Sequence, residues 1–126
     1  MEPLFRKVDC LSLKVADLDA ALDFYGRKLG HPLLWRSKTA AGLQMPDSDA
    51  ELVIHSDPVP TEPDLLVNSV PEAVERFQRA GGHLTKGPFE IAIGLYALVT
   101  DPWGNQIAML DMSKGKLKVD RDKNVV

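Results

Sequence analysis

Apolar and polar side chains alternate near the start of the chain, where Leu11, Leu13 and Val15 share one face of an extended segment. A period of two predicts a β-strand with one packed face. The period then changes to that of a helix. Asp17 is a good N-cap residue, and an apolar stripe at helical spacing follows it. The stripe consists of Leu18, Ala21, Leu22, Tyr25 and Leu29. The pattern therefore predicts a strand and then a helix over residues 18–29.

The same succession returns in the second half of the chain. Leu65 and Val67 alternate with their neighbours, and a capping box from Ser69 to Glu72 opens a second predicted helix over residues 70–80. Both helices are expected on the outside of curved sheets. The side chains expected to pack beneath them are Leu11, Leu13, Val15, Leu65 and Val67.

An internal repeat accounts for this recurrence. Residues 10–43 align without a gap on residues 62–95, and nine of the 34 pairs are identical. Chance would give about two identities at average composition. Two copies of this size indicate a domain of paired modules rather than a solenoid. The identical pairs are Leu13/Leu65, Val15/Val67, Ala21/Ala73, Arg27/Arg79, Gly30/Gly82, His31/His83, Ala40/Ala92, Gly42/Gly94 and Leu43/Leu95.

Three further extended segments follow each predicted helix, which gives the order βαβββ twice. They are expected near 32–36, 42–45 and 51–55, and near 83–86, 94–100 and 106–110. The predicted organisation is a single α+β domain over residues 1–126. Its parts are module one (8–56), a proline-rich linker (57–63), module two (64–111) and a basic tail (112–126), which we expect to be solvated and frayed.

Composition narrows the class of protein. The 126 residues are 44% hydrophobic and 26% charged, with a net charge of −3 and one cysteine. A single cysteine excludes an internal disulfide and a multi-cysteine zinc site. The net charge argues against nucleic-acid binding, and no apolar run approaches the roughly 20 residues that span a membrane. Because the start of the chain also lacks the apolar stretch of a signal peptide, we expect a cytoplasmic protein.

Several short motifs, in order, carry a family resemblance. They are Val15-Ala16-Asp17-Leu18, Phe24-Tyr25, Leu29-Gly30, Gly94, and the turn Asp101-Pro102-Trp103-Gly104-Asn105 with the strand that follows it. Together they resemble the vicinal oxygen chelate superfamily, the group of glyoxalase I, bleomycin-resistance proteins and extradiol dioxygenases, over roughly residues 8–111. The resemblance implies two βαβββ modules whose antiparallel and mixed sheets form a half-barrel cup with the helices outside. It also implies a homodimer.

The resemblance also implies where a divalent metal would bind in metal-dependent members. Their ligands come from the first and last strand of each module, and these positions fall on Cys10, Val53, Glu62 and Ala108. Valine and alanine have no donor atom, so a metal cofactor is not expected, although a rebuilt site at Cys10, His55 and Glu62 stays open. The expected ligand pocket is lined by Cys10, Ser12, Val53, His55, Glu62 and Ala108, and no catalytic residue is assigned.

Three functions follow from these residues and the resemblance. The favoured function is binding of a small molecule without the family's metal. The first alternative is a metal-dependent lyase or isomerase of the glyoxalase kind, or a dioxygenase-like enzyme, with a rebuilt site. The second is a metal-free enzyme with an acid or base such as Glu62. Trp103 is expected to pack within its turn, and Trp35 is expected to line either the cup or a subunit interface.

Overall fold

The computed structural model describes residues 2–126, which form two compact units. The module-one unit comprises Asp9–Thr61 and Lys118–Val126, and the module-two unit comprises residues 2–8 and Glu62–Leu117. Each module contributes four neighbouring strands and one helical segment, and each set of four strands is described below as the sheet of its module. No helix in this part of the chain is long and apolar enough to cross a membrane.

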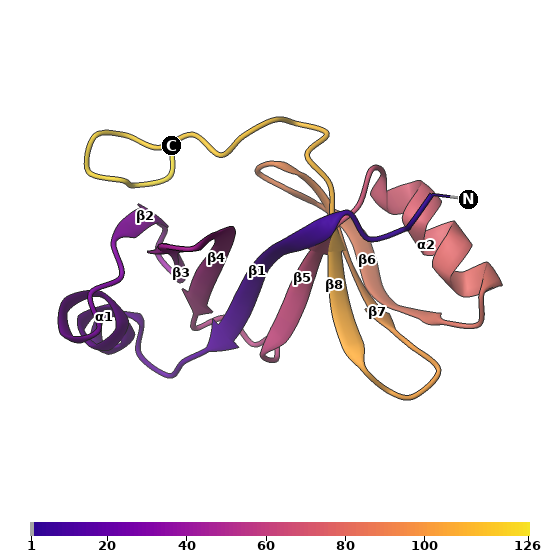
Figure 1. Ribbon diagram of the computed structural model, residues 1–126, viewed down its shortest axis with the longest axis horizontal. Coiled ribbons are helices and arrows are strands. Elements are labelled where there is room, and N and C mark those ends of the chain that lie inside the picture. The colour runs from indigo at the N-terminus through magenta and orange to yellow at the C-terminus, as the bar shows by residue number, and fades with distance from the viewer. Residues whose placement is uncertain (1) are drawn as a thin grey trace. The chain divides into compact units, whose positions relative to one another are not determined.

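The module-one sheet has the strand order β2-β3-β4-β1 (Figure 1). Its strands are β1 (Lys7–Lys14), β2 (Leu33–Arg36), β3 (Ala40–Met45) and β4 (Ser48–His55). β1 runs parallel to β4, and the other neighbours are antiparallel. The helical segment between β1 and β2 consists of α1 (Leu18–Leu22) and η1 (Asp23–Lys28). Asp17 caps α1 as expected, because its Oδ1 accepts a hydrogen bond from the Ala20 amide at 3.1 Å.

The module-two sheet repeats this topology in the order β5-β8-β7-β6. Its elements are β5 (Glu62–Leu66), α2 (Val70–Arg79), β6 (His83–Ile91), β7 (Gly94–Thr100) and β8 (Gln106–Leu110). β5 runs parallel to β8, as β1 does to β4, and the remaining pairs are antiparallel. The prediction of two βαβββ modules in an α+β fold is confirmed.

Each helix packs on one face of its own sheet. In module one, Leu18 and Ala21 of α1 contact a core that includes Ile54, with Leu13 and Val15 packed at its margin. In module two, α2 covers a core that contains Val67, as expected, and the other buried members of this core are Val70, Ala73, Val74, Ala97, Val99 and Met109. The opposite face of each sheet carries no helix of its own module.

Two side chains of the predicted apolar faces are not packed. Leu11 is 42% exposed, because α1 lies over β3 and β4 and does not cover β1 at this residue. Leu29 is 53% exposed, although it continues the apolar stripe of the predicted helix. The second half of that helix is a π-helix, in which the Leu29 amide donates to the carbonyl of Phe24, five residues back. The wider turn shifts the phase of the stripe and carries Leu29 away from the core.

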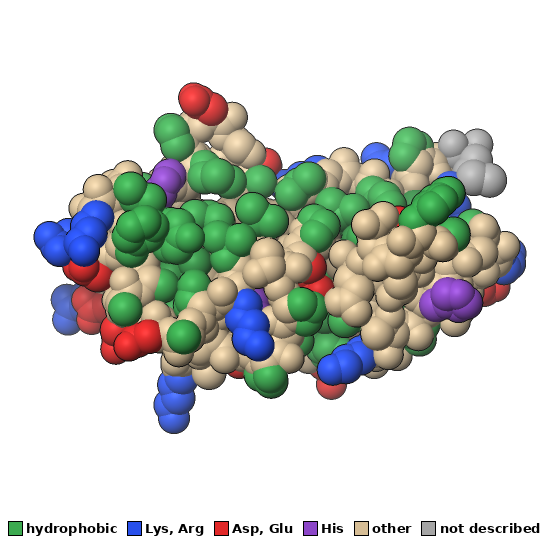
Figure 2. Space-filling model, turned by 90° about the horizontal axis from the view of Figure 1, so that it is seen from below, with side chains coloured by type: hydrophobic (Ala, Val, Ile, Leu, Met, Phe, Trp, Pro, Cys, Tyr) green, Lys and Arg blue, Asp and Glu red, His purple; other side chains and the backbone are tan. Residues whose placement is uncertain are grey.

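The surface of the module-one unit is consequently apolar in places. Figure 2 shows hydrophobic side chains gathered in the half of the view that holds α1 and β2 to β4. The exposed large apolar residues of this unit are Leu11, Phe24, Leu29, Val119 and Val126. Phe24 packs edge-on against Tyr25, with ring centroids 5.0 Å apart, instead of entering the core.

The boundaries of the modules differ from those predicted. β5 begins at Glu62, so the last two residues of the expected linker belong to a strand. The tail beyond Leu117 is not frayed, because the Arg36 amide donates to the Lys123 carbonyl at 2.8 Å and the Val125 amide donates to the Arg36 carbonyl at 2.9 Å. The end of the chain therefore pairs with β2, whose outer backbone groups are otherwise unused.

Candidate functional site

Four of the six expected pocket residues lie on adjacent strands of module one. Cys10 and Ser12 are on β1, and Val53 and His55 are on β4, with Ser12 in register with Val53 and Lys14 with His55. Because side chains alternate along a strand, all four lie on the face opposite α1. We call this the helix-free face of module one. The structure therefore brings these four residues together.

His55 is the most unusual polar side chain of this face. It is 3% exposed, and neither ring nitrogen has a hydrogen-bond partner within residues 2–126. Its neighbours in register are Lys14 on β1 and Ala40 on β3. A buried imidazole without a partner costs free energy, so the fold carries a cost at His55.

Trp35 and Glu51 form a polar contact on the helix-free face of module one. The indole Nε1 of Trp35 donates a hydrogen bond to Oε1 of Glu51 at 2.6 Å. Both side chains are half-buried, and the contact crosses Gly42 on the strand between them. Glu51 is not one of the six expected pocket residues, and Trp35 was expected to line either the cup or a subunit interface. The one signal in the sequence is the glycine that recurs at positions 42 and 94, because a glycine in a strand allows another side chain to pack across the backbone.

The environment of Glu51 favours its protonated form. Burial raises the pKa of this carboxyl group, the hydrogen bond from Trp35 lowers it, and the negative charge of Asp9 raises it again. The net result is a pKa above the ordinary glutamate value. Glu51 therefore keeps its proton to a higher pH than an exposed glutamate does.

The other two expected pocket residues lie on the corresponding face of module two. Glu62 on β5 is 4% exposed, and its Oε1 accepts a hydrogen bond from the hydroxyl of Tyr96 on β7. The Tyr96 ring packs against Phe89, with centroids 5.0 Å apart. Ala108 on β8 is fully buried beside Asp64. Glu62 is thus a buried strand residue and not an exposed linker carboxylate.

Removal of the Tyr96 hydroxyl tests the importance of this contact. Tyr96→Phe is expected to lower the free energy of unfolding by about 1–3 kcal/mol, because a buried carboxylate loses a donor. Urea unfolding measures the change. The matched control is Tyr25→Phe, since the hydroxyl of Tyr25 makes no hydrogen bond in the described part of the chain. Equal effects of the two substitutions would contradict the assignment.

The side chains at the family's metal-ligand positions do not fit a divalent ion. Val53 and Ala108 offer no oxygen, nitrogen or sulfur atom, and Ala108 is enclosed by its neighbours. Across residues 2–126, no three His, Cys, Asp or Glu side chains are grouped to hold a metal ion. Hard and borderline ions need several such donors at bonding distance.

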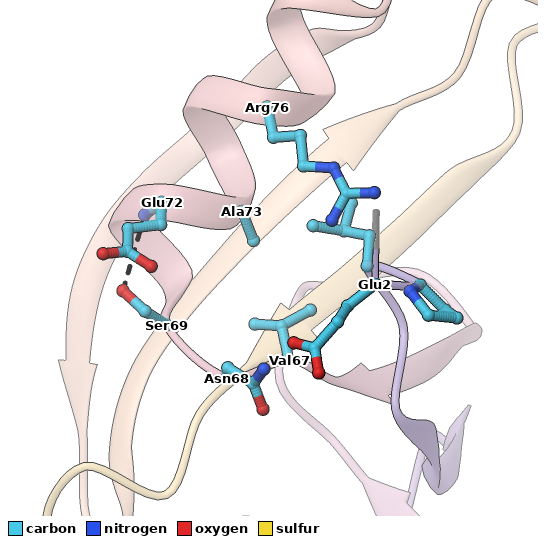
Figure 3. Close-up of a pocket in the computed structure, with 9 residues that line it drawn as sticks. Glu2, Val67, Asn68, Ser69, Glu72, Ala73 and Arg76 are labelled. Carbon is cyan, nitrogen blue, oxygen red and sulfur yellow. Dashed lines mark hydrogen bonds between the residues drawn. The ribbon is translucent and has the colours of Figure 1, made fainter.

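A separate pocket of about 170 Å³ lies at the start of α2 (Figure 3). Glu2, Asn68 and Arg76 line it together with Val67 and Ala73, which belong to the core beneath α2. None of the expected site residues lines it. Ser69, also at its wall, already caps the helix through its hydroxyl, which accepts from the Glu72 amide at 3.4 Å. Trp103 does not line this pocket. Its side chain is largely exposed at its turn and is not packed within the turn as expected.

Two tandem βαβββ modules, each with a helix on one sheet face and polar side chains on the other, define a class of paired-module proteins. A model of the Glyoxalase/Bleomycin resistance protein/Dioxygenase superfamily matches residues 7–109, and the chain belongs to this superfamily. The resemblance stated from the sequence motifs is therefore confirmed. No curated protein sequence matches the chain.

Solved structures show the same fold at low sequence identity. Methylmalonyl-CoA epimerase from Mycobacterium tuberculosis is 20% identical, with a TM-score of 0.73 over 90% of this chain and 92% of that one. A hypothetical protein from Bacillus halodurans is 13% identical, with a TM-score of 0.70 over 91% and 98%. An extradiol ring-cleaving dioxygenase from B. fuscum is 23% identical, with a TM-score of 0.63 over 87% of this chain and 33% of that one. The chain thus spans about a third of the dioxygenase, and these likenesses establish the fold alone.

Proposed function

We propose that this protein binds a small organic molecule on the helix-free faces of its modules, without the divalent metal of metal-dependent superfamily members. The observation that carries the proposal is the donor set. Two of the four ligand positions hold Val53 and Ala108, and Ala108 is fully buried. A carboxylate at the last position often doubles as the base in such enzymes, and alanine cannot replace it.

The remaining polar groups support the same proposal. Glu62 is engaged by the Tyr96 hydroxyl, and Glu51 is engaged by the Trp35 indole. Each of these hydrogen bonds holds its carboxyl group in one orientation, where it can meet a polar group of an organic ligand. His55 adds a buried imidazole to the same face, with no hydrogen-bond partner among the described residues.

Metal content after purification without chelators or added metal tests the proposal. We expect far less than one equivalent of any divalent ion per chain. The second measurement is thermal stability against a library of small molecules, because a ligand at 100 times its Kd stabilises the native state by about 2.7 kcal/mol. One equivalent of a divalent ion that is lost in Glu62→Ala, but kept in the exposed control Glu75→Ala, would refute the metal-free assignment.

A further inference from the structure

The indole of Trp35 occupies a position that only glycine at residue 42 allows. A β-carbon on Gly42 would overlap Nε1 of Trp35, and it would lie 2.5 Å from Cε2 and 2.6 Å from Oε1 of Glu51. The ring therefore covers the backbone of β3 directly. Because Nε1 is also bound to Glu51, the ring is held in place at its edge. Trp35 is only partly buried, so some of its surface remains accessible.

Glu51 has one oxygen in use and one available. Oε1 accepts from Trp35, and the hydrogen bonds of the described residues include none to Oε2. A glutamine at this position would accept the same bond from Trp35 without the cost of desolvating an ionisable group. Burial and the charge of Asp9 hold the pKa of Glu51 above its ordinary value, so the free oxygen carries the proton more readily than in an exposed glutamate. Retention of an acid at this cost is typical of functional positions.

We propose that Trp35 and Glu51 form a subsite for a flat, uncharged aromatic or heteroaromatic ligand, whose ring stacks on the indole and whose amide-like substituent forms a hydrogen bond with the Glu51 carboxyl group. The inference rests on the proposed function and names the chemical class of its ligand. Stacking supplies affinity for any planar ring, and the carboxyl group selects rings that carry a hydrogen-bonding substituent. Gly42 is a positioning residue of the subsite, because it allows the indole to lie where it does.

Nicotinamide is a suitable probe, because it is a planar, uncharged ring with an amide carbonyl. The chain has two tryptophans, and their indole N–H resonances in a proton–nitrogen NMR spectrum are assigned with Trp103→Phe. We expect nicotinamide to shift the Trp35 resonance in a saturable manner and to leave that of Trp103 unchanged. Cyclohexanecarboxamide has the same amide on a saturated ring, and we expect it to bind about tenfold more weakly or not at all.

Substitutions of Glu51 separate its role in binding from its role in folding. Glu51→Gln keeps a donor and an acceptor and is expected to retain nicotinamide binding within about threefold, whereas Glu51→Ala should lose about tenfold or more. The control is Glu75→Ala, an exposed residue of α2 with no part in the subsite. Urea unfolding of each variant tests whether a loss of binding comes from loss of the fold. Trp35→Phe removes the Nε1 donor but keeps an aromatic ring, and it should abolish the nicotinamide-sensitive resonance, which confirms the assignment to Trp35.

Three results would overturn the inference: no saturable shift of Trp35, equal binding of the two amides, or unchanged binding in Glu51→Ala. The proposed function fails separately. A library compound that stabilises the protein but leaves the Trp35 resonance unchanged would support small-molecule binding and refute this subsite. Conversely, nicotinamide binding at Trp35 in a protein that carries one equivalent of metal would support the subsite and refute the metal-free function.

Discussion

Replacement of Asp111 by alanine is expected to lower the free energy of unfolding by about 3 kcal/mol, the largest effect among the substitutions considered. Asp111 follows β8 and is 2% exposed. Its Oδ2 accepts from the Val70 amide at 2.9 Å, at the start of α2. Its Oδ1 accepts from the Leu95 amide at 2.9 Å and from the Ser113 hydroxyl at 2.7 Å. One carboxylate thus joins α2, β7 and the chain after β8, and alanine would leave these donors without a partner.

The effect of Asp111 should depend on pH. Burial raises the pKa of this carboxyl group, but the hydrogen bonds from Val70, Ser113 and Leu95 outweigh burial and hold the pKa below its ordinary value of 3.8. A lowered pKa in the folded state stabilises the protein above that ordinary value, and the stabilisation is lost as the pH falls through the folded pKa. The difference between wild type and Asp111→Ala should therefore be constant near neutral pH and shrink below about pH 4.

Asp120→Ala provides the matched control for Asp111. Asp120 also accepts two backbone hydrogen bonds, from Asp122 at 2.9 Å and Asn124 at 3.0 Å, but it is exposed, so water replaces the lost acceptor. Urea unfolding at several pH values measures both variants. If Asp111→Ala were no more destabilising than Asp120→Ala at neutral pH, the carboxylate would not hold the three segments together.

Gly42→Ala is expected to destabilise the protein by about 2 kcal/mol, the second of the two largest effects. The added methyl group would occupy the space of the Trp35 indole, so the ring must move and its hydrogen bond to Glu51 must break. A change in the indole N–H resonance of Trp35 should accompany the loss of stability. Both effects arise from one methyl group because β3 has no room for a side chain at this position.

Gly26→Ala is the control for the glycine substitution. A β-carbon at Gly26 meets nothing closer than the His31 carbonyl oxygen at 3.7 Å, an ordinary contact. Since alanine restricts the unfolded chain, we expect stability to be unchanged or to rise by up to about 1 kcal/mol. A Gly42→Ala variant that is as stable as Gly26→Ala, with an unshifted Trp35 resonance, would show that the indole is not packed on the strand as described.

Most of the fold could be predicted, because the spacing of apolar residues along the chain indicates which face of a strand or helix is buried. The alternation around Leu13 and the repeat of 52 residues establish two βαβββ modules, and the same alternation places Cys10, Ser12, Val53 and His55 on one face. The Trp35–Glu51 contact could not be predicted, because it depends on the register of β2 and β3, which is shifted between Leu33 and Trp35. A shift of one residue changes which side chains meet, and local patterns do not encode it.

The contacts that correct the sequence analysis have a common physical origin. Leu29 leaves the core because a π-helix replaces part of the predicted α-helix. Glu62 begins β5 instead of belonging to the linker, and its Oε1 accepts a hydrogen bond from Tyr96, 34 residues further along the chain. The apolar stripe does not specify the wider hydrogen bond of η1, and the residues near Glu62 do not specify its partner on β7.

Pairing of the last residues with β2 has a consequence for how molecules of this protein meet one another. β2 is the outermost strand of the module-one sheet, and the free backbone groups of such a strand form a template on which another chain can add. Lys123 and Val125 occupy the template at Arg36, and the tail carries further positive charges at Lys116, Lys118 and Arg121. We therefore expect the tail to hinder the addition of a second chain to this edge. Removal of the tail should lower the solubility of the protein more than its stability.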